Sequence, residues 1–156
     1  MLIDRFIENS LMANNSTRIV DRIEFINMKN EIIETFDYIY LPSLKIFKKV
    51  DINEQGINKA MLEANYGIAE TGTIIFISYA ENLRKASMLV QHLSFVLSKG
   101  NILTSLEDAS KILDAETKNK SNYISFITGP SRTADIENQL IIGVHGPLSQ
   151  EILILD

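Results

Sequence analysis

An arginine between two hydroxyl residues is the most promising chemical group in this 156-residue chain. Ser131, Arg132 and Thr133 stand where the sequence pattern predicts the start of a short helix. A guanidinium can hold a carboxylate or a phosphate through two parallel hydrogen bonds, and the free N–H groups at a helix start also favour an anion. The structural alternative is that Ser131 or Thr133 only caps the helix, while Arg132 pairs with Asp135 or Glu137.

Two further side chains could transfer protons. Glu70 precedes an apolar run in the segment Glu-Thr-Gly-Thr, where a carboxylate could act as a general base. His145 could shuttle a proton or donate a hydrogen bond to a carbonyl or hydroxyl group. The structural alternatives are that Glu70 pairs with Arg132 or accepts N–H bonds around Gly72, and that His145 bonds to a backbone carbonyl. The catalytic candidates are therefore Glu70 and His145, and the anion-binding candidates are Thr71, Gly72, Thr73, Gly129, Ser131, Arg132, Thr133, Asp135 and Gly146.

Two glycine–proline corners must position these residues. The first corner is Gly129 and Pro130, and the second is Gly146 and Pro147. An apolar, β-leaning run precedes each corner, and the short helix lies between the two runs. If the two strands are parallel neighbours, both corners project from the carboxyl edge of the sheet, where ligands usually bind in open α/β folds. We therefore expect the arginine and the histidine to face one pocket.

The rest of the chain reads as alternating helices and strands. Residues 18–33 fit either a helix capped by Asp21, with Ile23, Ile26 and Ile33 inward, or a helix with a brief strand before it. Gly67 is expected to end a helix predicted over residues 51–66. Further helices are predicted at 2–13 and 105–113. Strands are predicted at 38–41, 74–78, 93–97, 123–128, 140–145 and 151–155. This interleaving predicts an α/β domain with a largely parallel sheet.

The composition narrows the possible functions. A net charge of −5 and the lack of a basic stripe argue against a nucleic-acid partner. The chain has no cysteine, which excludes disulfides, a thiol nucleophile and an iron–sulfur cluster held by its own thiolates. With only two histidines, a histidine-rich metal site is not expected either. No apolar run has the length of a membrane span and no leader pattern opens the chain, so we expect a cytoplasmic protein.

Three segments, in order along the chain, resemble the signature segments of the lactate-utilisation (LUD) domain family. They are residues 67–73 (GIAETGT), 128–137 (TGPSRTADIE) and 143–147 (GVHGP). The resemblance implies a three-layer α/β sandwich like that of NagB, RpiA and the coenzyme A transferases, formed by residues 1–156 as one domain. Residues 1–66 are short and match the family pattern poorly.

The resemblance also implies a function. Members of the family belong to a system that oxidises L-lactate to pyruvate beside partners that carry iron–sulfur clusters. This chain would then be an accessory subunit that binds a small anionic metabolite, docks to a cluster-bearing partner, or does both, with no cofactor of its own. The fold analogy leaves an alternative: a stand-alone isomerase or acyl/CoA-transferase-like enzyme, with Glu70 as base or carboxylate nucleophile and Arg132 as anion clamp.

Overall fold

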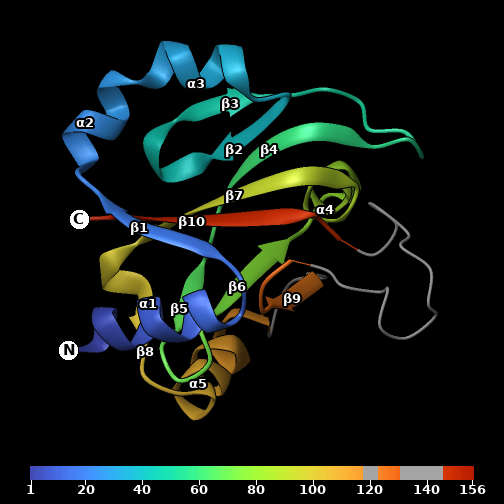
Figure 1. Ribbon diagram of the computed structural model, residues 1–156. Helices are drawn as coiled ribbons and strands as arrows, with labels where there is room; N and C mark the ends of the chain where they lie inside the picture. The colour runs from blue at the N-terminus through green and yellow to red at the C-terminus, as the bar shows by residue number, and fades with distance from the viewer. Residues whose placement is uncertain (118–122, 131–145) are drawn as a thin grey trace.

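A six-stranded sheet forms the centre of the fold in the computed structural model, which describes residues 1–117, 123–130 and 146–156 (Figure 1). Its strand order is β1-β10-β7-β4-β2-β3. The strands are β1 (Ser16–Val20), β10 (Ser149–Leu155), β7 (Val90–Ser98), β4 (Ile57–Glu63), β2 (Tyr38–Leu41) and β3 (Ile46–Lys48). Neighbouring strands are parallel except β2 and β3, which are antiparallel. The expected α/β class and mostly parallel sheet are therefore confirmed.

The central strands are buried on both faces. In β10, Ile152 and Ile154 belong to one core cluster, while Leu153 and Leu155 belong to another on the opposite face. Side chains alternate between the two faces of a strand, so a strand covered on both sides reads as a continuous apolar run. The sheet is therefore the wall between two separate hydrophobic cores.

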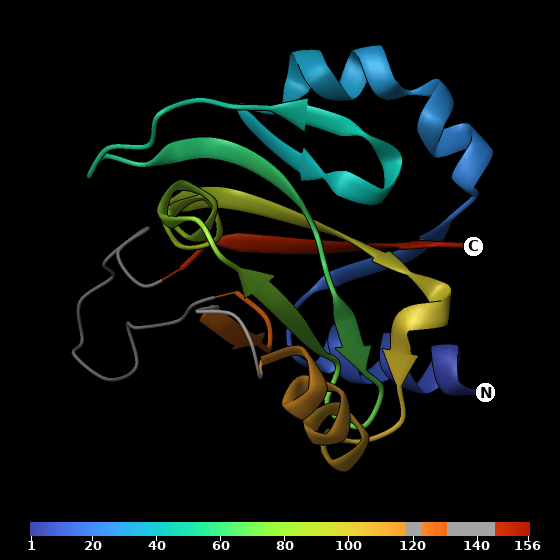
Figure 2. The same ribbon diagram turned by 180° about the vertical axis from the view of Figure 1, so that it is seen from behind.

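Helices α2 (Arg22–Asn27) and α3 (Lys29–Thr35) cover one face of this sheet through Phe25 and Ile32. The opposite face packs against α1 (Leu2–Met12), α4 (Glu81–Met88) and a second sheet. The second sheet has the order β8-β5-β6-β9 and consists of β8 (Ile102–Leu103), β5 (Tyr66–Ile68), β6 (Thr73–Ser78) and β9 (Tyr123–Ile127). Helix α5 (Leu106–Thr117) packs on its outer face, so α2 and α3 lie on one side of the molecule and α5 on the other (Figures 1 and 2). Short 3-10 turns occur at Pro42–Leu44 and Lys99–Asn101.

Asp21 separates a strand from a helix, which decides between the two readings of residues 18–33. Its carboxylate accepts hydrogen bonds from the N–H groups of Ile23 at 2.9 Å and Glu24 at 3.0 Å. The prediction that Ile23 and Ile26 point inward is wrong, because they are 70% and 45% exposed. The helix breaks at Met28 into α2 and α3, so the buried face shifts to other positions.

The helix predicted over residues 51–66 is wrong, since residues 57–63 form β4. The apolar spacing there resembled a helix, but Ala60, Met61 and Leu62 are all buried because β4 lies between β2 and β7. A fully covered strand cannot be told from a buried helix by periodicity alone. Gly67 does not end a helix: it lies in β5, where an added Cβ would stand 2.8 Å from atoms of Phe6 and Leu97.

Several other elements follow the sequence prediction, whereas α4, β3, β5 and β8 were not predicted. Helices α1 and α5 form where expected, and so do the strands β2, β6, β7, β9 and β10. However, β9 lies in the second sheet and pairs antiparallel with β6, not in the parallel sheet. The predicted strand at 140–145, its expected parallel neighbour, lies outside the described residues.

Candidate ligand site at the two glycine–proline corners

The two glycine–proline corners line one cavity of about 310 Å³. Gly129 and Pro130 follow β9, and Gly146 and Pro147 precede β10, yet both corners contribute to the same wall. The rest of the lining comes from residues 125–128 and from Ser87 and Met88 at the end of α4. Two segments that are separate in the sequence therefore meet beside the second sheet.

Both corner glycines have backbone conformations that side chains disfavour. Gly129 has a φ angle of +82° and Gly146 a φ angle of +139°. An added Cβ on Gly129 would stand 2.0 Å from the carbonyl oxygen of Ala13, just beyond α1. Glycine is required at the first corner both for its φ angle and for the close approach of α1.

A chain of three hydroxyl groups runs from the second sheet to the corner cavity. The hydroxyl oxygens of Thr71 and Thr73 are 2.7 Å apart, and those of Thr73 and Thr128 are also 2.7 Å apart. Thr73 is buried, whereas Thr71 and Thr128 are exposed. Each hydroxyl can donate one hydrogen bond and accept others, so the chain can orient a donor toward a ligand oxygen.

Thr128 joins the corner cavity to a second cavity of about 440 Å³. That second cavity is lined by Ile68, Thr71, Thr73, Leu106, Phe126 and Thr128. The predicted anion-binding residues Thr71 and Thr73 therefore lie next to the corner cavity and are connected to it through Thr128. Sequence reasoning did not single out Thr128; its signal was a hydroxyl at the end of a strand, immediately before a glycine–proline corner.

The turn that carries Gly72 is held against α1. Gly72 has a φ angle of +68°, and an added Cβ would stand 2.3 Å from the backbone nitrogen of Ser10. The side-chain amide of Asn9 donates hydrogen bonds to the carbonyl oxygens of Ala69 at 2.8 Å and Glu70 at 3.1 Å. Gly72 therefore shapes the turn that presents Thr71 and Thr73.

The Glu70 carboxylate lies at the start of α5 and lines neither cavity. Its Oε2 accepts a hydrogen bond from the N–H of Leu106 at 3.2 Å, and its own N–H donates to the carbonyl of Thr104. A carboxylate at this position satisfies a free N–H of the first helical turn and complements the helix dipole. This contact was not expected, because the sequence suggested N–H partners around Gly72.

The other predicted site residues, Ser131, Arg132, Thr133, Asp135 and His145, lie outside the described residues. In the described part of the chain, no group of three or more His, Asp or Glu side chains is placed to hold a metal ion. None of the described helices is both long enough and apolar enough to cross a bilayer.

Comparison with known proteins places the chain among longer relatives. It is 35% identical over 96 residues to the uncharacterized protein YkgG of Escherichia coli K12, covering 60% of this chain and 42% of YkgG. It is 34% identical over 115 residues to lactate utilization protein C of Bacillus subtilis 168, covering 67% and 48% of the two chains. With lactate utilization protein C of Oceanobacillus iheyensis it shares 25% identity over 157 residues, which is 99% of this chain and 66% of the relative. The chain therefore spans between 42% and 66% of the length of these relatives.

The fold has a counterpart among solved structures. The crystal structure of a DUF162 family protein from Deinococcus radiodurans superposes with a TM-score of 0.69 over 99% of this chain and 96% of that one, at 14% sequence identity. At this identity the likeness concerns the fold. The sequence model of the LUD domain matches residues 14–155, which include both corners and the hydroxyl chain. This chain belongs to the LUD-domain family.

Proposed function

We propose that this chain is an accessory subunit of an L-lactate-oxidising iron–sulfur system and that its corner cavity binds a small anionic metabolite. The proposal draws on its membership of the LUD-domain family and on relatives named lactate utilization protein C. Oxidation of lactate to pyruvate releases two electrons and two protons. The chain has no cysteine to hold a cluster, so the proposal assigns the electrons to clusters in a partner protein to which this subunit docks.

The observation that carries the proposal is the meeting of both corners at one cavity. Ser131 is bonded to Pro130 and His145 is bonded to Gly146, so the predicted anion-binding segment is joined at both ends to residues of that cavity. In the proposed site, Arg132 supplies the positive charge and Thr128 supplies a hydroxyl oriented by Thr73. A carboxylate such as that of lactate or pyruvate has the charge and size that such a site would hold.

Ligand binding tests this site directly. We expect lactate, pyruvate or inorganic phosphate to bind the purified chain in calorimetric titrations, and Arg132→Gln to weaken that binding at least tenfold, on the order of one charged hydrogen-bonded contact. Thr128→Val should weaken it less, because it removes one neutral contact. Arg5→Gln changes an exposed arginine on α1 and serves as the matched control. Equal affinity of the Arg132 and Arg5 variants would refute the site.

Reconstitution tests the role in the assembly. The cluster-bearing partner proteins from the same organism should oxidise L-lactate faster with this chain than without it. The Arg5→Gln variant should restore the rate fully, whereas Arg132→Gln should restore it only in part. A full rate in the absence of this chain would refute the accessory role, while leaving the binding result to stand by itself.

The alternative, an isomerase or acyl/CoA-transferase-like enzyme of the NagB and RpiA fold class, needs Glu70 as base or nucleophile. The Glu70 carboxylate accepts a hydrogen bond from the Leu106 N–H at the start of α5, and Glu70 does not line the corner cavity. Among the described residues, no contact of Glu70 favours the alternative, which therefore stands second. Loss of turnover of a sugar phosphate or an acyl-CoA in Glu70→Gln would reverse this order.

A further inference from the structure

A separate cavity of about 190 Å³ lies between the six-stranded sheet and helices α2 and α3. It is on the face of the sheet opposite the second sheet and α4, so it is distinct from the corner cavity. Its floor is apolar and is formed by Phe25, Ile32, Met61 and Leu153. An engineered apolar cavity of about 150 Å³ admits benzene, so this one has room for a side chain of that size.

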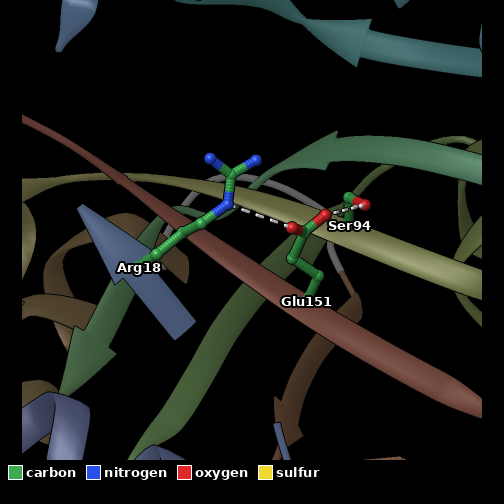
Figure 3. Close-up of polar contacts among 3 residues, drawn as sticks. All are labelled: Arg18, Ser94 and Glu151. Carbon is green, nitrogen blue, oxygen red and sulfur yellow. Dashed lines mark hydrogen bonds and ion pairs between the residues drawn. The ribbon is translucent and has the colours of Figure 1, made fainter. Parts of the chain in front are cut away.

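Arg18, on β1, lines one side of this cavity and gives it a positive charge that can attract an anion. Its Nε lies 3.4 Å from Oε1 of Glu151 on β10, and Oε2 of Glu151 accepts a hydrogen bond from the Ser94 hydroxyl at 3.0 Å. Ser94 is only 6% exposed, so a buried hydroxyl group fixes the position of the Glu151 carboxylate. Figure 3 shows the two terminal nitrogens of Arg18 pointing away from Glu151. A guanidinium held at Nε with its terminal nitrogens open can grip a carboxylate.

Glu31, on α3, contributes a negative charge to the same cavity. Its carboxylate forms no ion pair with any residue in the described part of the chain. The charged lining groups are thus Arg18, Glu31 and Glu151, and Glu151 already faces Arg18. Among the described residues, the cavity therefore offers the two terminal nitrogens of Arg18 and one carboxylate without an ion pair, beside an apolar floor.

We propose that this cavity binds an α-amino acid with an apolar side chain. The ligand's carboxylate bonds to the terminal nitrogens of Arg18, its ammonium group faces Glu31, and its side chain covers the floor at Met61. A simple monocarboxylate would pair with Arg18 but leave Glu31 without a partner, and a simple amine would pair with Glu31 but leave the terminal nitrogens of Arg18 unused. The zwitterion alone satisfies both charged groups. This site is independent of the proposed role in lactate oxidation.

Methionine methyl groups provide the readout. Met28 and Met61 line the cavity, whereas Met12 lies on α1 and Met88 lines the corner cavity. In protein labelled with ¹³C at the methionine methyls, L-leucine should shift the Met28 and Met61 signals saturably and leave Met12 and Met88 unchanged. Its analogues 4-methylpentanoate and 3-methylbutylamine, which keep one charge each, should bind at least about tenfold more weakly. Equal affinity for leucine and either analogue overturns the proposal.

Two pairs of variants locate the charged contacts. Arg18→Gln and Glu31→Gln should each weaken leucine binding at least about tenfold, whereas Arg5→Gln and Glu34→Gln, which change exposed charges on α1 and α3 outside the cavity, should not. All four positions are exposed, and unchanged thermal unfolding of the variants verifies that they fold. No saturable shift up to about 50 mM leucine, or equal binding by Arg18→Gln and Arg5→Gln, overturns the site. Shifts confined to Met88 would assign leucine to the corner cavity and also overturn it.

Discussion

Gly129 and Ala13 are in such close contact that the first corner has room for no side chain. An added Cβ on Gly129 would stand 2.0 Å from the carbonyl oxygen of Ala13. This contact joins the end of β9 to the residue that follows α1, two segments at opposite ends of the sequence. The shape of the corner cavity therefore depends on the position of α1 as well as on the corner itself.

Replacing Gly129 by alanine should destabilise the fold strongly. The new methyl group would clash with a backbone oxygen, and the φ angle of +82° is itself unfavourable for alanine. We expect the free energy of unfolding to fall by about 2–3 kcal/mol in urea titrations. Gly100→Ala is the matched control, because no atom lies within 4 Å of its added Cβ; it should change stability by less than about 0.5 kcal/mol. Equal stability of the two variants would show that the corner relaxes freely.

Replacing Thr73 by valine should remove the centre of the hydroxyl chain while preserving shape. Thr73 is 5% exposed and its hydroxyl contacts those of Thr71 and Thr128. Both partners are exposed and can turn to water, so the free energy of unfolding should fall by only about 1 kcal/mol. Anion binding should weaken as well, because Thr128 loses the contact that orients it. Thr104→Val, at an exposed position, is the control. A Thr73 variant with unchanged affinity would show that the three hydroxyl groups take no part in anion binding.

Removing the Glu70 carboxylate should weaken the start of α5. Glu70→Ala deletes the acceptor for the Leu106 N–H and should lower the free energy of unfolding by about 1 kcal/mol. Glu70→Gln keeps an acceptor oxygen and should cost less. Glu54→Ala, at an exposed position in a turn, is the control. If Glu70→Ala leaves stability unchanged but abolishes an activity, the role of the carboxylate is in catalysis and not in stabilising α5.

Stability should decline at alkaline pH because of Tyr40. Burial first, and then the hydrogen bond with Tyr79, raise the pKa of Tyr40 above its ordinary value of 10.0; burial also raises the pKa of Tyr38. A raised pKa means that the folded state holds the phenol proton more tightly than the unfolded chain does. Its stabilising contribution is therefore complete below pH 10 and is lost as the pH rises toward the folded-state pKa.

Urea unfolding at pH 9 to 11 measures this loss. Tyr40→Phe cannot ionise, so the decline above about pH 10 should be shallower than in the natural sequence. Tyr123→Phe, at an exposed position on β9, should leave the decline unchanged. A Tyr40 variant whose stability falls as steeply as that of the natural sequence would contradict the assignment.

The sequence predicted those helices and turns that depend on interactions between residues close together in the chain. Asp21 caps a helix because its carboxylate reaches N–H groups two and three residues on, and α1 repeats its apolar residues at helical spacing. The glycines of both corners were also readable, since few other residues adopt their φ angles. The three signature segments pointed to the LUD-domain family, and the family match extends from residue 14 to residue 155.

Only the tertiary structure decided which segments pair and what each polar side chain contacts. Residues 57–63 form a strand because β2 and β7 cover both of its edges, and β9 pairs with β6 in a separate sheet. The bonds of Glu70 to Leu106 and of Thr73 to Thr128, and the cavity beside Arg18, depend on residues far apart in the chain. Spacing along the sequence carries no record of such contacts, because strand pairing and packing are set by the free energy of the whole fold and not by any one segment.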